Sequence, residues 1–117
     1  MRVDVAVRSH RAVIALDGDL DLASAPQLVE ATKATIAHEP QLTLLVLDLA
    51  DVSFMDSSGL KAVLHAAHAM RGRKRFLLIN VQPQVARMID LIGDGKLLTM
   101  HRLDDPLPEA VADLSSR

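Results

Sequence analysis

Two adjacent serines stand between an aspartate and a glycine where a strand pattern gives way to a helix pattern. The segment Asp56-Ser57-Ser58-Gly59 follows an apolar run over residues 44–49 and precedes residues with helical spacing. The start of a helix exposes backbone N–H groups and carries partial positive charge, so it holds anions well. Aspartate and serine are also common helix caps. A serine at this place can therefore cap the helix, accept a phosphate, or do both.

Phosphorylation of a serine here would change the surface more than the fold. A phosphoserine adds about −1.5 to −2 charges near neutral pH. The helix start can accommodate that charge, whereas a partner that fitted the hydroxyl must now desolvate a dianion. Asp56 raises the local negative potential, and Asp19 and Asp21 add to it if their loop folds alongside. Gly59 is expected to leave the backbone open to a close approach by a kinase.

Other residues with chemical potential have plainer explanations. Ser58 and Lys61 have the S-x-x-K spacing of serine acylases, but the chain is far too short for that fold and lacks the S-D-N and K-T-G partners. Lys61 is better explained as a solvated residue that could steady a phosphate. His65 and His68 lie three apart without a clear third ligand, which favours a solvated helix face over a metal site. The basic run over residues 71–75 is better explained as cations at a helix C-terminus, where they interact favourably with the negative end of the helix dipole. We expect no catalytic residue, metal or cofactor.

Composition and length narrow the class of protein. The chain has 117 residues, which suit a single domain over residues 1–117, and half of them are hydrophobic. A net charge of −2 argues against direct binding of nucleic acid. The chain has no cysteine, so it has no disulfide. No apolar run reaches the roughly 18 residues that span a bilayer, and the start shows no signal-peptide pattern. We expect a cytoplasmic protein without membrane insertion.

Strand and helix patterns alternate along the chain around the two serines. Strands are predicted over residues 2–8 (with one wet face), 12–16, 42–49, 76–79 and 97–101, with a turn at 9–11. The run over 42–49 is too apolar for a wet face and predicts a strand buried on both sides. Helices are predicted over residues 24–39, 57–70 and 83–92 and from 106 onward. The order predicts an α/β fold with a mixed, mostly parallel sheet of about five strands flanked by about four helices.

Three details of the helices are predicted from single residues. Ser24 and Gln27 have capping-box spacing at the start of the first helix. Gly72 is predicted to cap the second helix at its end. The third helix is predicted to point Val85, Met88, Ile89 and Ile92 inward and to break at residues 93–95, and the last to use Leu107, Ala110, Val111 and Leu114.

The motif and its flanks resemble a known family. Residues 47–60, LDLADVSFMDSSGL, closely resemble the signature of STAS domains, and more narrowly the bacterial anti-anti-sigma factors, or anti-sigma factor antagonists. Residues 18–21 followed by 25–28 resemble their GELD…APxL segment, and residues 83–93 resemble their late helix. The resemblance covers essentially the whole chain in order and spacing. Lys61 and the Gly93-Asp94 pair depart from many relatives and could alter the choice of partner.

The resemblance implies a regulator that works by partner switching and is not an enzyme. The unmodified protein would bind an anti-sigma factor that is also a serine kinase, which frees a sigma factor. The kinase would phosphorylate the serine before the glycine, here Ser58, and release its partner, and a serine phosphatase would reset the site. Ser57 would then be the structural hydroxyl. The partner surface and phosphosite environment implied are Asp19, Asp21, Asp56, Ser57, Gly59, Leu60 and Lys61.

Two points remain open at the level of sequence. STAS domains also serve as subunits that support ABC-type lipid transport or other membrane transport complexes, although the complete motif favours the phosphorylation switch. A homodimer is also compatible with the sequence.

Overall fold

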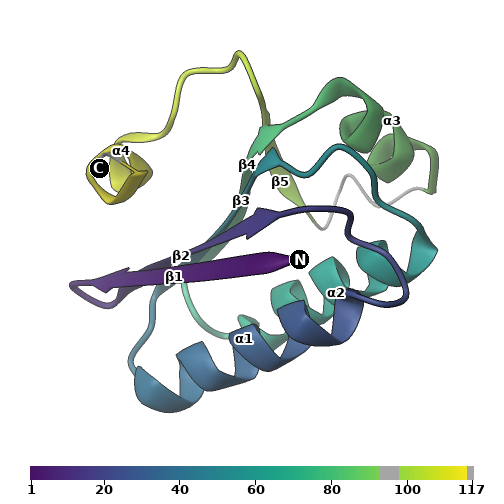
Figure 1. Cartoon of the computed structure of the whole chain (residues 1–117). Helices are drawn as coiled ribbons and strands as arrows, with labels where there is room; N and C mark the ends of the chain where they lie inside the picture. Colours follow the sequence, from purple (N-terminus) through teal and green to yellow (C-terminus); the bar gives the residue numbers. More distant parts are fainter. Residues whose placement is uncertain (93–97, 116–117) are drawn as a thin grey trace.

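The computed structural model describes residues 1–92 and 98–115, which form a five-stranded sheet with helices on both faces (Figure 1). The strands lie in the order β1-β2-β3-β4-β5. β1 and β2 are antiparallel, and the other neighbouring pairs are parallel. The strands are β1 (Arg2–Arg8), β2 (Arg11–Asp17), β3 (Leu44–Asp51), β4 (Arg75–Val81) and β5 (Thr99–Arg102). The helices are α1 (Ala25–His38), α2 (Ser57–Ala69), α3 (Pro83–Ile92) and α4 (Glu109–Ser115).

The predicted fold class and element order are confirmed, and the bounds of β2, β3 and β4 differ by one or two residues. α1 and α2 cover one face of the sheet, and α4 lies on the other (Figure 1). β3 is buried on both sides, as predicted, because its side chains alternate between two apolar clusters. Leu45 and Leu47 join the larger cluster with α1 and α2, whereas Leu44 and Val46 join the smaller one with α4. No helix of the described residues is long and apolar enough to cross a bilayer.

The opening hairpin is tighter and more exposed than predicted. Only Ser9 and His10 form its turn, both with left-handed φ angles of 53° and 65°, and Arg11 already pairs with Arg8. β1 does not have a single wet face, because Val5 and Val7 are exposed. Val3 alone of the three packs against the core. The alternating valines predicted a buried face, but the cover provided by α1 does not extend along the whole of an edge strand.

Several helix details differ from their predictions. Ser24 precedes α1 but makes no cap hydrogen bond to it, because its hydroxyl donates to the carbonyl of Asp19 instead. Ile92 is exposed at the end of α3, so it does not point inward. Leu107 packs on the core from ahead of α4, which begins two residues later. Gly72 lies just beyond α2 with a φ of 79°, the left-handed conformation expected after a helix end.

The break at residues 93–95 and the first residue of the last predicted strand, residue 97, lie outside the described residues. The departure at Gly93-Asp94 falls there too. Within the basic run, Arg73 donates to the carbonyls of Pro40 and Leu42 at 2.5 and 3.2 Å, which gives it a structural role.

Candidate functional site

Asp56 caps the start of α2. Its Oδ1 accepts a hydrogen bond from the backbone N–H of Gly59 at 2.9 Å, and its own backbone is extended. Ser57 is the first helical residue and is exposed, and among the described residues no hydrogen bond of its hydroxyl is found. Of Asp56 and Ser57, Asp56 alone therefore provides the side-chain cap of α2. Ser57 occupies the helix start without the structural hydrogen bond that its predicted role called for.

The loop over residues 18–24 folds alongside the start of α2. Leu20 pairs with Met55 in an isolated parallel bridge. The Leu20 N–H donates to the Phe54 carbonyl at 2.9 Å, and the Asp56 N–H donates to the Leu20 carbonyl at 3.2 Å. The Leu22 N–H donates to Asp56 Oδ2 at 3.3 Å. The Asp56 carboxylate thus ties the loop to the start of α2.

Gly59 allows this loop to pack closely against the start of α2. Its Cα faces the backbone of Leu20 so closely that an added Cβ would overlap the Leu20 carbonyl oxygen and lie 2.9 Å from both its carbonyl carbon and its Cγ. Gly59 is buried, so the expectation that it leaves the backbone open to a kinase is wrong. Leu60 is likewise buried in the core. Both residues shape the site without presenting surface to a partner.

The two loop aspartates differ in their surroundings. Asp21 Oδ1 accepts hydrogen bonds from the N–H groups of Ala23 and Ser24 and from the Ser24 hydroxyl, each at 3.1 Å. The bond from the Ser24 backbone is the main reason that the pKa of Asp21 lies below its ordinary value. Asp21 is therefore ionised and fixed inside its own turn. Asp19 is exposed, and its carbonyl accepts the Ser24 hydroxyl at 2.6 Å.

Ser58 is the second residue of α2 and lines a groove between α1 and α2. It is partly buried, and Lys61 and His65 follow it along the same groove wall. The rest of the lining is mostly apolar and comes from the loop, α1 and α2: Leu22, Ala25, Pro26, Val29, Glu30 and Ala62. Ser58 therefore lies at a boundary between a charged rim and an apolar hollow.

Two exposed apolar side chains near the start of α2 were missed by the sequence analysis: Leu22 lines the groove, and Phe54 lies two residues before the helix cap. Leu22 is 75% exposed and Phe54 is 50% exposed. The sequence did carry a signal for each of them. Leu22 follows an acidic loop segment without any helical pattern to bury it, and Phe54 is one of only two aromatic residues in the chain.

Backbone groups at the start of α2 remain available to an anion. The first intrahelical bond joins the Leu60 N–H to the Asp56 carbonyl, and Gly59 is bonded to the Asp56 side chain. Among the described residues the N–H groups of Ser57 and Ser58 have no partner. Such groups at the positive end of a helix bind phosphate oxygens. Among the described residues, no hydrogen bond between the Ser58 hydroxyl and an acid or a histidine is found.

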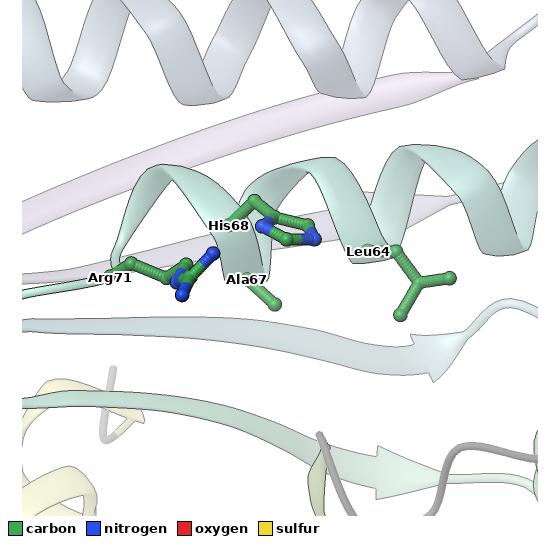
Figure 2. Close-up of a pocket in the computed structure, with 4 residues that line it drawn as sticks. All are labelled: Leu64, Ala67, His68 and Arg71. Atoms are coloured by element: carbon green, nitrogen blue, oxygen red, sulfur yellow. The ribbon is translucent and has the colours of Figure 1, made fainter.

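The two histidines of α2 face different hollows. His65 lines the groove with Ser58, whereas His68 lines a separate pocket with Leu64, Ala67 and Arg71. Figure 2 shows Leu64 and Ala67 pointing from α2 away from α1, on the side opposite the groove. No metal-binding cluster is found among the described residues. Both histidines are exposed, in keeping with a solvated helix face.

Comparison with known proteins places the motif in its family. Residues 2–106 match the family model of the STAS domain. The anti-sigma-F factor antagonist RsfB of Mycobacterium tuberculosis is 32% identical over 96 residues, which cover 80% of this chain and 77% of RsfB. An anti-sigma factor antagonist from Mycobacterium paratuberculosis has a similar structure, with a TM-score of 0.79, 25% identity and coverage of 97% of this chain and 92% of that one.

A second similar protein has been solved in two chemical forms. The unphosphorylated anti-sigma factor antagonist SpoIIAA is 25% identical, with a TM-score of 0.68 and coverage of 97% of this chain and 96% of that one. Phosphorylated SpoIIAA from Bacillus shares the fold at 23% identity and the same TM-score, with coverage of 98% and 100%. The family match over nearly the whole chain and the shared architecture lead to one conclusion: the chain belongs to the STAS domain family.

Proposed function

We propose that this protein is an anti-sigma factor antagonist controlled by phosphorylation of Ser58. In its unmodified form it binds an anti-sigma factor that is also a serine kinase, and a sigma factor is freed. Transfer of a phosphate from ATP to the Ser58 hydroxyl ends this binding. A serine phosphatase restores the hydroxyl. The protein itself acts as a binding partner and a phosphate acceptor, and the chemistry belongs to the kinase and the phosphatase.

The position of Ser58 is the observation that carries this proposal. It is the second residue of α2, it lines a groove, and its own N–H and that of Ser57 lack partners among the described residues. A phosphate there meets the positive helix end and stays on the surface. Lys61 lies one turn further along the same groove. Its flexible side chain can bring an ammonium group to a phosphate on Ser58. The fold can therefore carry the phosphate without rearranging.

The partner would experience the change mainly as charge. Leu22 lines the same groove as Ser58, and the exposed Phe54 lies just before the helix cap, so this region offers apolar area that suits a binding surface. A dianion on Ser58 must be desolvated on binding. Asp56 lies two residues before Ser58, and its carboxylate holds the Leu22 N–H by a bond of 3.3 Å. Phosphate on Ser58 therefore adds negative charge close in sequence to an existing carboxylate, which increases the cost of desolvating this surface.

Relatives support the same assignment. RsfB and SpoIIAA are both named as anti-sigma factor antagonists, and SpoIIAA exists in unphosphorylated and phosphorylated forms. Membrane transport complexes also contain STAS domains, but no feature of the described residues favours that role here.

The direct test is phosphorylation by a serine-kinase anti-sigma factor encoded in the same genome, followed by mass spectrometric mapping. Wild-type protein and Ser57→Ala should each take up one phosphate, and Ser58→Ala should take up none. Ser57→Ala is the matched control because it removes the neighbouring hydroxyl from the same helix turn. Ser58→Ala should still bind the kinase and resist release by ATP. Undiminished phosphate incorporation in folded Ser58→Ala would overturn the assignment, and selective capture of a transporter ATPase in place of the kinase would point to membrane transport.

A further inference from the structure

β1 is an edge strand whose outer side is unpaired among the described residues and which carries exposed apolar side chains. β1 is the first strand of the sheet and pairs only with β2 among the described residues. In an antiparallel pair, alternate residues turn their N–H and C=O groups away from the partner strand, so β1 presents a row of such groups on its open side. Val5 and Val7 beside it are 46% and 48% exposed. Figure 1 shows β1 at the margin of the sheet.

We propose that this edge pairs with the β1 edge of a second copy of the chain, antiparallel and about a two-fold axis at Ala6. In that register Ala6 faces Ala6 of the second copy, and Val5 faces Val7 of the second copy in two equivalent places. Asp4 faces Arg8 of the second copy, also twice. The pairing joins two five-stranded sheets into one, continues the backbone hydrogen bonding, and covers four exposed valines.

Charge selects this register over its neighbours. A pairing centred on Val5 would set Arg2 opposite Arg8 of the second copy, and like charges directly opposite destabilise strand pairs. A pairing centred on Asp4 would oppose two carboxylates. Among the described residues, the Asp4 side chain makes an exposed ion pair with Arg2 at 3.2 Å, which is weak enough to be exchanged. Of the two-fold registers that pair both Val5 and Val7 within β1, the one centred on Ala6 is thus the one that opposes unlike charges.

The proposed dimer does not compete with the switch. The hairpin turn after β1 and the start of α2 lie at opposite ends of the molecule in Figure 1. A two-fold axis at Ala6 lies toward the hairpin end, so Ser58 stays accessible in both copies. The inference is independent of the proposed function, and either can fail alone.

Sedimentation equilibrium of the unphosphorylated full chain tests the proposal over a wide range of concentration, because a strand-pair interface is small and its dimer weak. The wild-type average mass should rise from the monomer value toward twice that value. Asp4→Arg and Arg8→Asp should each weaken dimerisation by about tenfold or more, since each opposes two pairs of like charges. Lys33→Glu, an exposed change on α1 with the same charge difference as Arg8→Asp, should dimerise like wild type.

Mixing the two single variants gives the decisive result. An equimolar mixture of Asp4→Arg and Arg8→Asp restores both opposite-charge pairs, so it should form heterodimers with near wild-type affinity. The double variant in one chain should likewise recover homodimers. Circular dichroism checks that every variant is folded. A wild-type chain that stays monomeric at all concentrations would overturn the proposal. A dimer that survives both single variants, or a mixture that stays monomeric, would also overturn it.

Discussion

The start of α2 and the outer edge of β1 are both exposed, but they are built in opposite ways. At the start of α2, a loop, a strand end and a helix are joined by hydrogen bonds among Leu20, Leu22, Phe54, Asp56 and Gly59. Along β1, no strand of the described residues pairs with the outer side of the backbone, and valines alternate with mostly charged residues. The first surface depends on each residue that makes it. The second depends on alternation and on the charges of Asp4 and Arg8, so it should tolerate substitution at its other positions.

The largest expected effect comes from Gly59→Ala. In most helices such a change stabilises by about 1 kcal/mol, because glycine is a poor helix former. Here the added methyl overlaps the Leu20 carbonyl, so we expect a loss of about 3 kcal/mol or more in the free energy of unfolding. Urea denaturation measures it. Val5→Thr on β1 is the control from the tolerant surface and should stay within about 0.5 kcal/mol of wild type. A Gly59→Ala variant that is more stable than wild type would contradict the close packing of Gly59 against Leu20.

Leu22→Ser should weaken binding of the anti-sigma kinase while leaving the fold intact. Leu22 is 75% exposed, so little core packing is lost, whereas a central apolar contact in an interface contributes about 2 kcal/mol. Calorimetric titration should show roughly thirtyfold weaker binding. Leu103→Ser, an exposed leucine after β5, is the matched control and should bind normally. Equal affinities for all three proteins would mean that the loop does not touch the partner.

Asp56→Ala should cost about 1 kcal/mol of stability, the usual loss for a helix cap. It also removes the acceptor of the Leu22 N–H, so amide exchange in residues 20–24 should become faster. Asp56→Asn keeps an acceptor oxygen and should lose less stability. If exchange in the loop is unchanged in Asp56→Ala, the carboxylate does not tie the loop to the helix.

The smallest effect is a pH dependence from Asp21. Its folded-state pKa lies below the ordinary value of 3.8, so the charged form is favoured by folding. The stabilisation is fully present above the unfolded-state pKa and is lost as the pH falls through the folded-state pKa. Wild type should therefore be more stable than Asp21→Asn at neutral pH, and the gap should narrow below pH 3.8. A gap that widens in acid would have the wrong sign.

Local patterns predicted the scaffold well. The apolar run now in β3 indicated burial on both faces, and the change of period after Asp56 located the start of α2. Both follow from residues close together in sequence. The capping hydrogen bond predicted for Ser24 is absent because two acceptors in the preceding loop compete with the helix for its hydroxyl. The role of Gly59 escaped because it depends on Leu20, a distant residue whose backbone arrives only through the fold.

The central claim is that phosphate on Ser58 decides partner binding, and calorimetry of the anti-sigma kinase with the two purified forms tests it most directly. The unmodified protein should bind, and the form carrying one phosphate on Ser58 should bind about a hundredfold more weakly or worse, a loss of about 2.7 kcal/mol. Circular dichroism of the two forms should coincide, because the helix start accommodates the phosphate. Equal affinity of the two forms for the kinase would contradict the account.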